Sequence, residues 1–145
     1  MEYPKALGPM LGRCAHLTRE RMDARLSGCD VTPAQTHILL YLHRHGGQAL
    51  QRTVTEFLRV KPSTANGILD RMEEKGLVTR SVSGSDARRR LITLTEKGKD
   101  RQERFQRVFL DTENVVVRGF APEEREQFIS LLERAIQNLE EDRTV

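Results

Sequence analysis

The residues with the clearest binding chemistry lie between positions 62 and 75. Small, hydrogen-bonding or flexible residues fill the first half of this segment: Ser63, Thr64, Asn66 and Gly67. Hydroxyl and carboxamide groups bond readily to phosphates and to base edges, and a helix N-terminus attracts anions. The pattern is typical of a helix that lies against nucleic acid.

Gly67 and Arg71 in the same segment each allow more than one interpretation. A glycine inside a helix costs about 1 kcal/mol relative to alanine. At Gly67 either a side chain would obstruct close approach to DNA, or the helix packs tightly against a neighbour, or the glycine has drifted there without a role. Arg71 either binds a phosphate or guanine, or is a solvated arginine beside Glu73 and Glu74. The polar neighbours of Gly67 favour the DNA interpretation for that glycine.

A second group of cations follows between positions 80 and 90. It comprises Arg80, Arg88, Arg89 and Arg90, with Asp86 as the one acid among them. Arginine enters narrow minor grooves well, because the negative potential there attracts it. The alternative is that these charges protect strand edges and keep the chain in solution. Asp86 is expected to pair with Arg88 or Arg90 and to fix the local geometry.

Composition and charge agree with a polyanion-binding protein. The chain has 145 residues and a net charge of +3, but residues 48–100 carry 11 Lys or Arg against 7 Asp or Glu, whereas residues 101–145 are net acidic. A basic middle segment suits nucleic acid. No apolar run is long enough to span a membrane and no secretory leader is visible, so we expect a cytoplasmic protein without a membrane partner.

These residues need a scaffold, and hydrophobic spacing predicts one. Thr32-Pro33-Ala34-Gln35 is a capping box with proline at the first helical position. The expected elements are helices at 7–26, 32–45, around 54–58 and 62–75, strands at 77–82 and 90–94, and helices from 95 and from 122. This order predicts a mainly α fold with a small β-hairpin wing.

The predicted organisation is one domain over residues 1–145. A winged helix-turn-helix occupies residues 32–95, and its second paired helix is the natural reader of the major groove. Helical segments at 5–27 and 96–141 flank it. Such a lobe either binds specific DNA sequences or, as the alternative, uses the same face as a protein-interaction module without specific DNA binding.

Two segments give the chain a specific family resemblance. Residues 86–98, Asp86-Ala87-Arg88 through Leu94-Thr95-Glu96-Lys97-Gly98, resemble the wing pattern of the MarR family, D-x-R followed by an apolar strand and L-T-x-x-G. Residues 62–64 and 69–80 look like that family's recognition helix and its exit. The resemblance covers nearly the whole chain, although Lys61 stands where members often have a capping serine, and Gly67 where they often have a polar or charged residue.

The resemblance implies a homodimeric winged-helix transcription regulator. Its first, fifth and sixth helices would form the dimer interface, with a ligand cleft between that interface and the DNA-binding lobe. We expect a repressor that binds a pseudo-palindromic site on double-stranded DNA and is released by a small-molecule effector. The expected DNA-binding residues are Lys61, Ser63, Thr64, Asn66, Gly67, Arg71, Arg80, Asp86, Arg88, Arg89 and Arg90.

The histidines and Tyr41 give weaker indications of function than the residues above. His16, His37 and Tyr41 are candidates for the ligand cleft, since His37 and Tyr41 share a helix face. His43 and His45 lack metal-ligand spacing, so no metal or other cofactor is expected. The sequence contains no catalytic or nucleotide-binding motif, which argues against an enzyme.

The two cysteines cannot form a disulfide framework, in keeping with a reducing compartment. Cys14 falls on the apolar stripe of the first helix, so we expect a buried structural cysteine rather than an oxidant sensor. Cys29 lies in a loop and is expected to be the more exposed thiol.

Overall fold

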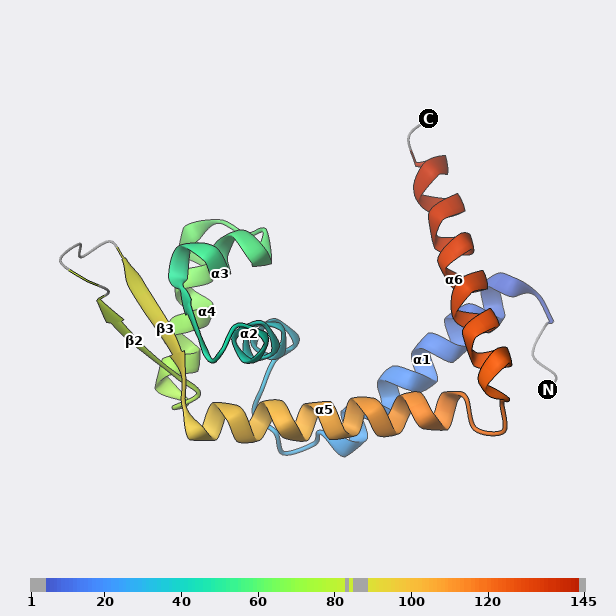
Figure 1. Cartoon of the computed structure of the whole chain (residues 1–145), viewed down its shortest axis with the longest axis horizontal. Coiled ribbons are helices and arrows are strands. Elements are labelled where there is room, and N and C mark those ends of the chain that lie inside the picture. Colours follow the sequence, from blue (N-terminus) through green and yellow to red (C-terminus); the bar gives the residue numbers. More distant parts are fainter. Residues whose placement is uncertain (1–4, 83, 85–88, 144–145) are drawn as a thin grey trace. The chain divides into compact units, whose positions relative to one another are not determined.

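Helices make up most of the chain, and its strands are short. The computed structural model describes residues 5–82, 84 and 89–143. In these residues the elements are α1 (Leu7–Arg25), α2 (Pro33–Arg44), β1 (Gln48–Leu50), α3 (Gln51–Leu58), α4 (Pro62–Glu74), β2 (Val78–Val82), β3 (Arg90–Leu94), α5 (Glu96–Val116) and α6 (Pro122–Asp142) (Figure 1). They form two compact units, residues 1–109 and 110–145. The predicted mainly α fold with a hairpin wing is confirmed.

The start of α2 is fixed by the capping box that the sequence predicts. The Thr32 side chain accepts from the backbone N–H of Gln35, and Gln35 Oε1 accepts from the backbone N–H of Thr32, both at 3.2 Å. These two bonds satisfy N–H groups that a helix start otherwise leaves without partners. The helix then buries Ile38, Leu39 and Leu42 in the core.

Two short helices form the helix-turn-helix. The helix α3 ends where Arg59 adopts a left-handed backbone conformation with φ of 56°. Pro62 then opens α4, where a missing N–H costs nothing. Ala65, Leu69 and Met72 form the buried stripe of α4, so its remaining face is left for other contacts.

The sheet is antiparallel, with strand order β1-β3-β2. In the hairpin Val78 pairs with Leu94 and Val82 with Arg90. The strand β1 pairs with the other edge of β3 and was not predicted from the sequence. It has only three residues, too few to show an alternating polar and apolar pattern, and its pairing with β3 is what makes it a strand.

One core holds the winged helix together. Its buried members come from α2, α3, α4, the hairpin and the residue before it, and they are Ile38, Leu39, Leu42, Val54, Leu69, Met72, Leu77, Val78, Ile92 and Leu94. Figure 1 shows α2, α3 and α4 gathered beside the β2–β3 hairpin. Burial of this apolar surface fixes the orientation of α4.

The passage from the hairpin into α5 is tightly built. Thr95 Oγ1 lies 2.6 Å from the carbonyl oxygen of Gly76 and accepts from the backbone N–H of Gly98 at 3.0 Å, so Thr95 caps α5. A Cβ on Gly98 would lie 2.2 Å from the carbonyl oxygen of Leu77. Only glycine lets α5 start this close to the hairpin.

The second unit contains the end of α5 and the helix α6. At the start of α6 the backbone N–H of Ala121 donates to Glu124 Oε1 at 2.8 Å. Phe120 packs edge-to-face on Phe128, with ring centroids 5.9 Å apart. No residue of α6 is buried, and Leu131, Ile136 and Leu139 are exposed.

The helix α1 has no buried residue, and the expected burial of each of the two cysteines is wrong. Cys14 is exposed rather than buried, as are Met10, Leu11 and Leu17 on the same stripe. Cys29 is partly buried and is the less exposed thiol, and it lines a hollow together with Leu26, Val31 and Phe105. None of the helices in the described part of the chain is long and apolar enough to cross a bilayer.

Candidate nucleic-acid interface

The outer side of α4 carries the residues that the sequence singled out. Ser63, Thr64, Gly67 and Arg71 are all exposed, and together we call them the α4 face. An added Cβ on Gly67 would meet no atom of the described residues within 4 Å. Tight packing against the described residues therefore does not explain this glycine, which leaves close approach of an external molecule or a glycine without a role.

The beginning of α4 is open to an anion. Lys61 is the N-cap residue and is exposed, but its side chain makes no cap hydrogen bond. The N–H of Ala65 bonds to the carbonyl oxygen of Lys61, which leaves the N–H groups of Ser63 and Thr64 without helical acceptors. These N–H groups, the helix dipole and the Lys61 ammonium group all favour a phosphate.

Arg80 does not extend freely from the hairpin. Its Nη2 forms ion pairs with Asp70 and, at 3.1 Å, with Glu73, and only 10% of its side chain is exposed. Its backbone N–H also donates to Glu73 Oε2 at 3.2 Å. Burial lowers the pKa of Arg80, but the bonds to Asp70 and Glu73 outweigh burial and raise its pKa above the ordinary arginine value.

The same guanidinium reaches the middle of α4. Arg80 Nη1 donates to Asn66 Oδ1 at 3.0 Å. Gln51 Nε2, at the start of α3, donates to the same oxygen at 3.3 Å. Asn66 is therefore partly buried and held from two sides, whereas the α4 face around it is exposed.

The structure describes two of the three consecutive arginines of the wing. Arg89 and Arg90 are exposed, while Asp86 and Arg88 lie outside the described residues. Arg90 borders a hollow of about 620 Å³ between α3, the start of α4 and β3. Gln51, Arg52, Pro62 and Asn66 also line it, and we call it the wing hollow.

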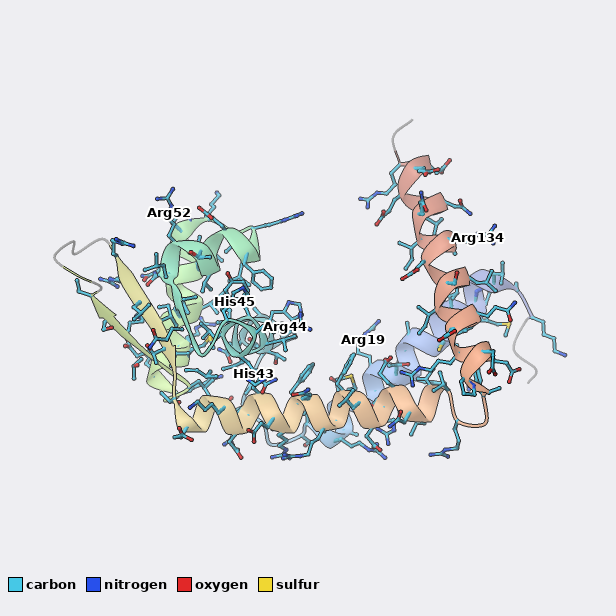
Figure 2. All side chains as sticks on the ribbon, viewed as in Figure 1. Arg19, His43, Arg44, His45, Arg52 and Arg134 are labelled. Atoms are coloured by element: carbon cyan, nitrogen blue, oxygen red, sulfur yellow. The ribbon has the colours of Figure 1, made fainter. Side chains whose placement is uncertain are left out.

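Gln51 and Arg52 are not among the DNA-binding residues that the sequence predicts. Arg52 projects outward from α3 (Figure 2) and its exposed pair with Glu56, at 3.4 Å, leaves it accessible. Their place in the first helix of the helix-turn-helix could have identified them, because that helix crosses the DNA backbone. Arg52 and Arg90 thus put two cations at the wing hollow.

The three candidate ligand residues are not brought together. His37 lines a hollow of about 490 Å³ among the end of α1, the following loop, α2 and α5, which we call the His37 hollow. Tyr41 instead stacks on His45, with ring centroids 4.0 Å apart, and contacts Phe57 with its ring tilted and the centroids 4.5 Å apart. His16 is exposed on α1, 3.3 Å from Glu20.

Two histidines lie at the end of α2. His45 Nδ1 lies 2.7 Å from the carbonyl oxygen of Tyr41, and His43 and Arg44 lie beside it in sequence at the same helix end (Figure 2). The part of the chain that the structure describes contains no cluster of three His, Cys, Asp or Glu side chains able to hold a metal ion.

Comparison with known proteins agrees with this geometry. A sequence model described as the MarR family matches residues 30–89. The structure is similar to that of MepR, a transcription regulator of the Staphylococcus aureus multidrug efflux pump MepA, with 27% identity, a TM-score of 0.74, and coverage of 92% of this chain and 98% of that chain.

Two further solved structures are similar over nearly their whole length. A single-residue mutant of S. aureus MepR bound to an oligodeoxyribonucleotide is 30% identical, with a TM-score of 0.67 and coverage of 93% of this chain and 99% of that chain. The YusO protein of Bacillus subtilis is 25% identical, with a TM-score of 0.76 and coverage of 88% and 90%.

Proposed function

Since this chain belongs to the MarR family, we propose that it is a DNA-binding transcription regulator that acts as a homodimer and represses its target until a small ligand releases it. The proposal assigns the chain a binding role and no chemical reaction. A regulator of this kind acts in the compartment that holds the DNA, and the sequence predicts a cytoplasmic protein.

The observation that carries the proposal is the uncovered α4 face. Ser63 and Thr64 offer small polar groups at a helix start whose first N–H groups lack helical acceptors, and the exposed Gly67 adds no side chain to this face. The cations Arg52 and Arg90 border the neighbouring wing hollow. Such a helix fits the major groove, with phosphates at its N-terminus and the wing at the adjacent minor groove.

Homodimer formation is supported by apolar side chains that the chain itself leaves in solvent. On α1 these include Leu7, which is 82% exposed, and Leu17, and on α6 they include Ile136 and Leu139. Apolar patches of this kind mark association surfaces. A twofold dimer presents two copies of α4, so the DNA site would be a pseudo-palindrome with half-sites about one helical turn apart.

The His37 hollow supports a response to a small ligand. Its volume of about 490 Å³ lies within the usual range for small-molecule sites, and Met22, Leu26 and Phe105 give it an apolar lining beside the His37 imidazole. A ligand there would contact the α1–α2 loop and the first turns of α2. Movement of these segments would displace α4, to which Lys75 connects them.

Selection of bound sites from a random pool of duplexes tests the proposal. We expect a pseudo-palindromic site, bound about 10³-fold or more tightly than unrelated DNA at moderate salt. A protein-interaction module would bind all duplexes weakly and alike, and such a result would overturn the proposal.

A further inference from the structure

We propose that Asn66 reads an acceptor edge of a base, that of guanine, because Arg80 and Gln51 hold its carboxamide so that only N–H donors remain to face DNA. This inference rests on the proposed function, since it names what the DNA-binding face recognises. Arg80 and Gln51 act here as positioning residues.

Arg80 decides which way the carboxamide of Asn66 faces. A side-chain amide has an acceptor oxygen and a donor nitrogen of nearly equal size, so its orientation follows from its partners. A guanidinium has donors only. The Asn66 atom 3.0 Å from Arg80 Nη1 must therefore be the oxygen.

Arg80 is itself fixed, so this orientation is not a passing one. Its Nη2 pairs with Asp70 and Glu73, and its Nε donates to Glu73 Oε1 at 3.4 Å. Both acids lie on α4, one and two turns after Asn66. The guanidinium thus stays in place relative to the helix that it orients.

Gln51 occupies the second acceptor site of the same oxygen. Its Nε2 lies 3.3 Å from Asn66 Oδ1, and a carbonyl oxygen has two lone pairs. Gln51 keeps this orientation although its own Oε1 is buried without a hydrogen-bond partner among the described residues. If the Gln51 amide were turned around, its Oε1 would face Asn66 Oδ1, and two acceptors would repel each other. Asn66 cannot turn its own amide to avoid this, because Arg80 needs Oδ1 as an acceptor.

The consequence is a one-sided recognition group beside the α4 face. Asparagine recognises adenine by accepting from N6 and donating to N7, and this requires a free Oδ1. In Asn66 both lone pairs of Oδ1 are used, and Nδ2 offers two hydrogens. Guanine presents two acceptors, O6 and N7, in the major groove, which is the pattern that two donors match.

Two variants of Asn66 test whether its N–H donors, rather than the size of its side chain, determine the base preference. Asn66→Asp keeps an oxygen for Arg80 and removes both N–H donors, while Asn66→Ala removes the group without adding charge. Bound sites selected with each protein should lose the guanine preference at the same position of each half-site. The preferences at the other positions should remain, and thermal unfolding monitored by circular dichroism checks that both variants fold.

Modified DNA then tests the contact itself. Replacing that guanine by 7-deazaguanine removes the N7 acceptor and should weaken wild-type binding about tenfold. The same replacement should hardly change the affinity of the Asn66→Ala variant, because the base change and the substitution remove the same contact.

The outcomes distinguish this inference from the proposed function. If wild-type protein selects a site but both variants keep every base preference, or lose an adenine instead, Asn66 is not a reader of guanine. Uniform weakening across all sequences would mean that Asn66 binds phosphate, which also overturns the inference while leaving the regulator intact. A wild-type protein that selects no sequence would overturn the proposed function.

Discussion

Lys75 Nζ donates to Gln35 Oε1 at 3.1 Å, which joins the C-cap of the recognition helix α4 to the capping box of α2. The same ammonium group bonds to the carbonyl oxygen of Asp30 at 2.9 Å and lies 3.3 Å from its carboxylate. One side chain thus connects the α1–α2 loop, the start of α2 and the end of α4. The neighbouring residues Cys29, Val31 and Thr36 line the His37 hollow.

We predict that Lys75→Met lowers the free energy of unfolding by about 1.5–3 kcal/mol, the usual contribution of hydrogen bonds to a charged group. Methionine retains the length of the stem but none of the donors. Urea denaturation measures the change. Lys99→Met is the matched control, because its exposed pair with Glu96 contributes little. Equal stability of the two variants would show that Lys75 does not tie these segments together.

Gly98→Ala should lower the free energy of unfolding by about 1–3 kcal/mol or more, through overpacking. The added Cβ would lie 2.2 Å from the Leu77 carbonyl oxygen and 2.8 Å from Leu94 Cδ1, so the start of α5 must shift. Thermal unfolding measures the effect. Gly12→Ala on α1, where a Cβ meets no atom of the described residues within 4 Å, is the control and should not be destabilised.

Gly67→Ala should have opposite effects on stability and on DNA binding. No described atom lies within 4 Å of the added Cβ, and alanine in a helix is favoured over glycine, so stability should rise by up to about 1 kcal/mol. If DNA approaches α4 closely at this point, affinity for the selected site should fall. Denaturation and fluorescence anisotropy measure the two quantities, and a more stable variant with unchanged affinity would show that Gly67 has no role in close approach.

Arg90→Ala should flatten the salt dependence of binding. An arginine that neutralises one phosphate contributes about one unit to the slope of log affinity against log salt concentration. The sequence predicts the same for Arg88→Ala. Arg44→Ala serves as control, since Arg44 is exposed at the end of α2, outside the α4 face and the wing hollow. A slope unchanged from wild type would remove Arg90 from the DNA contacts.

Local features made much of the fold predictable from the sequence. The capping box of Thr32 and Gln35 and the proline at position 62 set helix starts through bonds between near neighbours. The strand β1 could not be predicted in this way, because Gln48–Leu50 depends on pairing with β3 more than 40 residues later.

The site was predictable in its residue types and less so in its internal bonds. The exposed Ser63, Thr64 and Gly67 follow from helical spacing. The orientation of Asn66 does not, since it requires Gln51 from α3 and Arg80 from β2 to meet at one oxygen. The exposure of Cys14 was misjudged because an apolar stripe shows that a face seeks a partner but not whether the same chain supplies it.

The central claim is that two copies of the chain present α4 to one specific duplex. The most direct measurement is the mass of the complex, by light scattering, when the protein is titrated with its selected duplex and with a shuffled duplex of equal length. We expect two chains on the selected duplex and no stable complex with the shuffled one at moderate salt. A single chain per duplex, or equal binding to both, would contradict the claim.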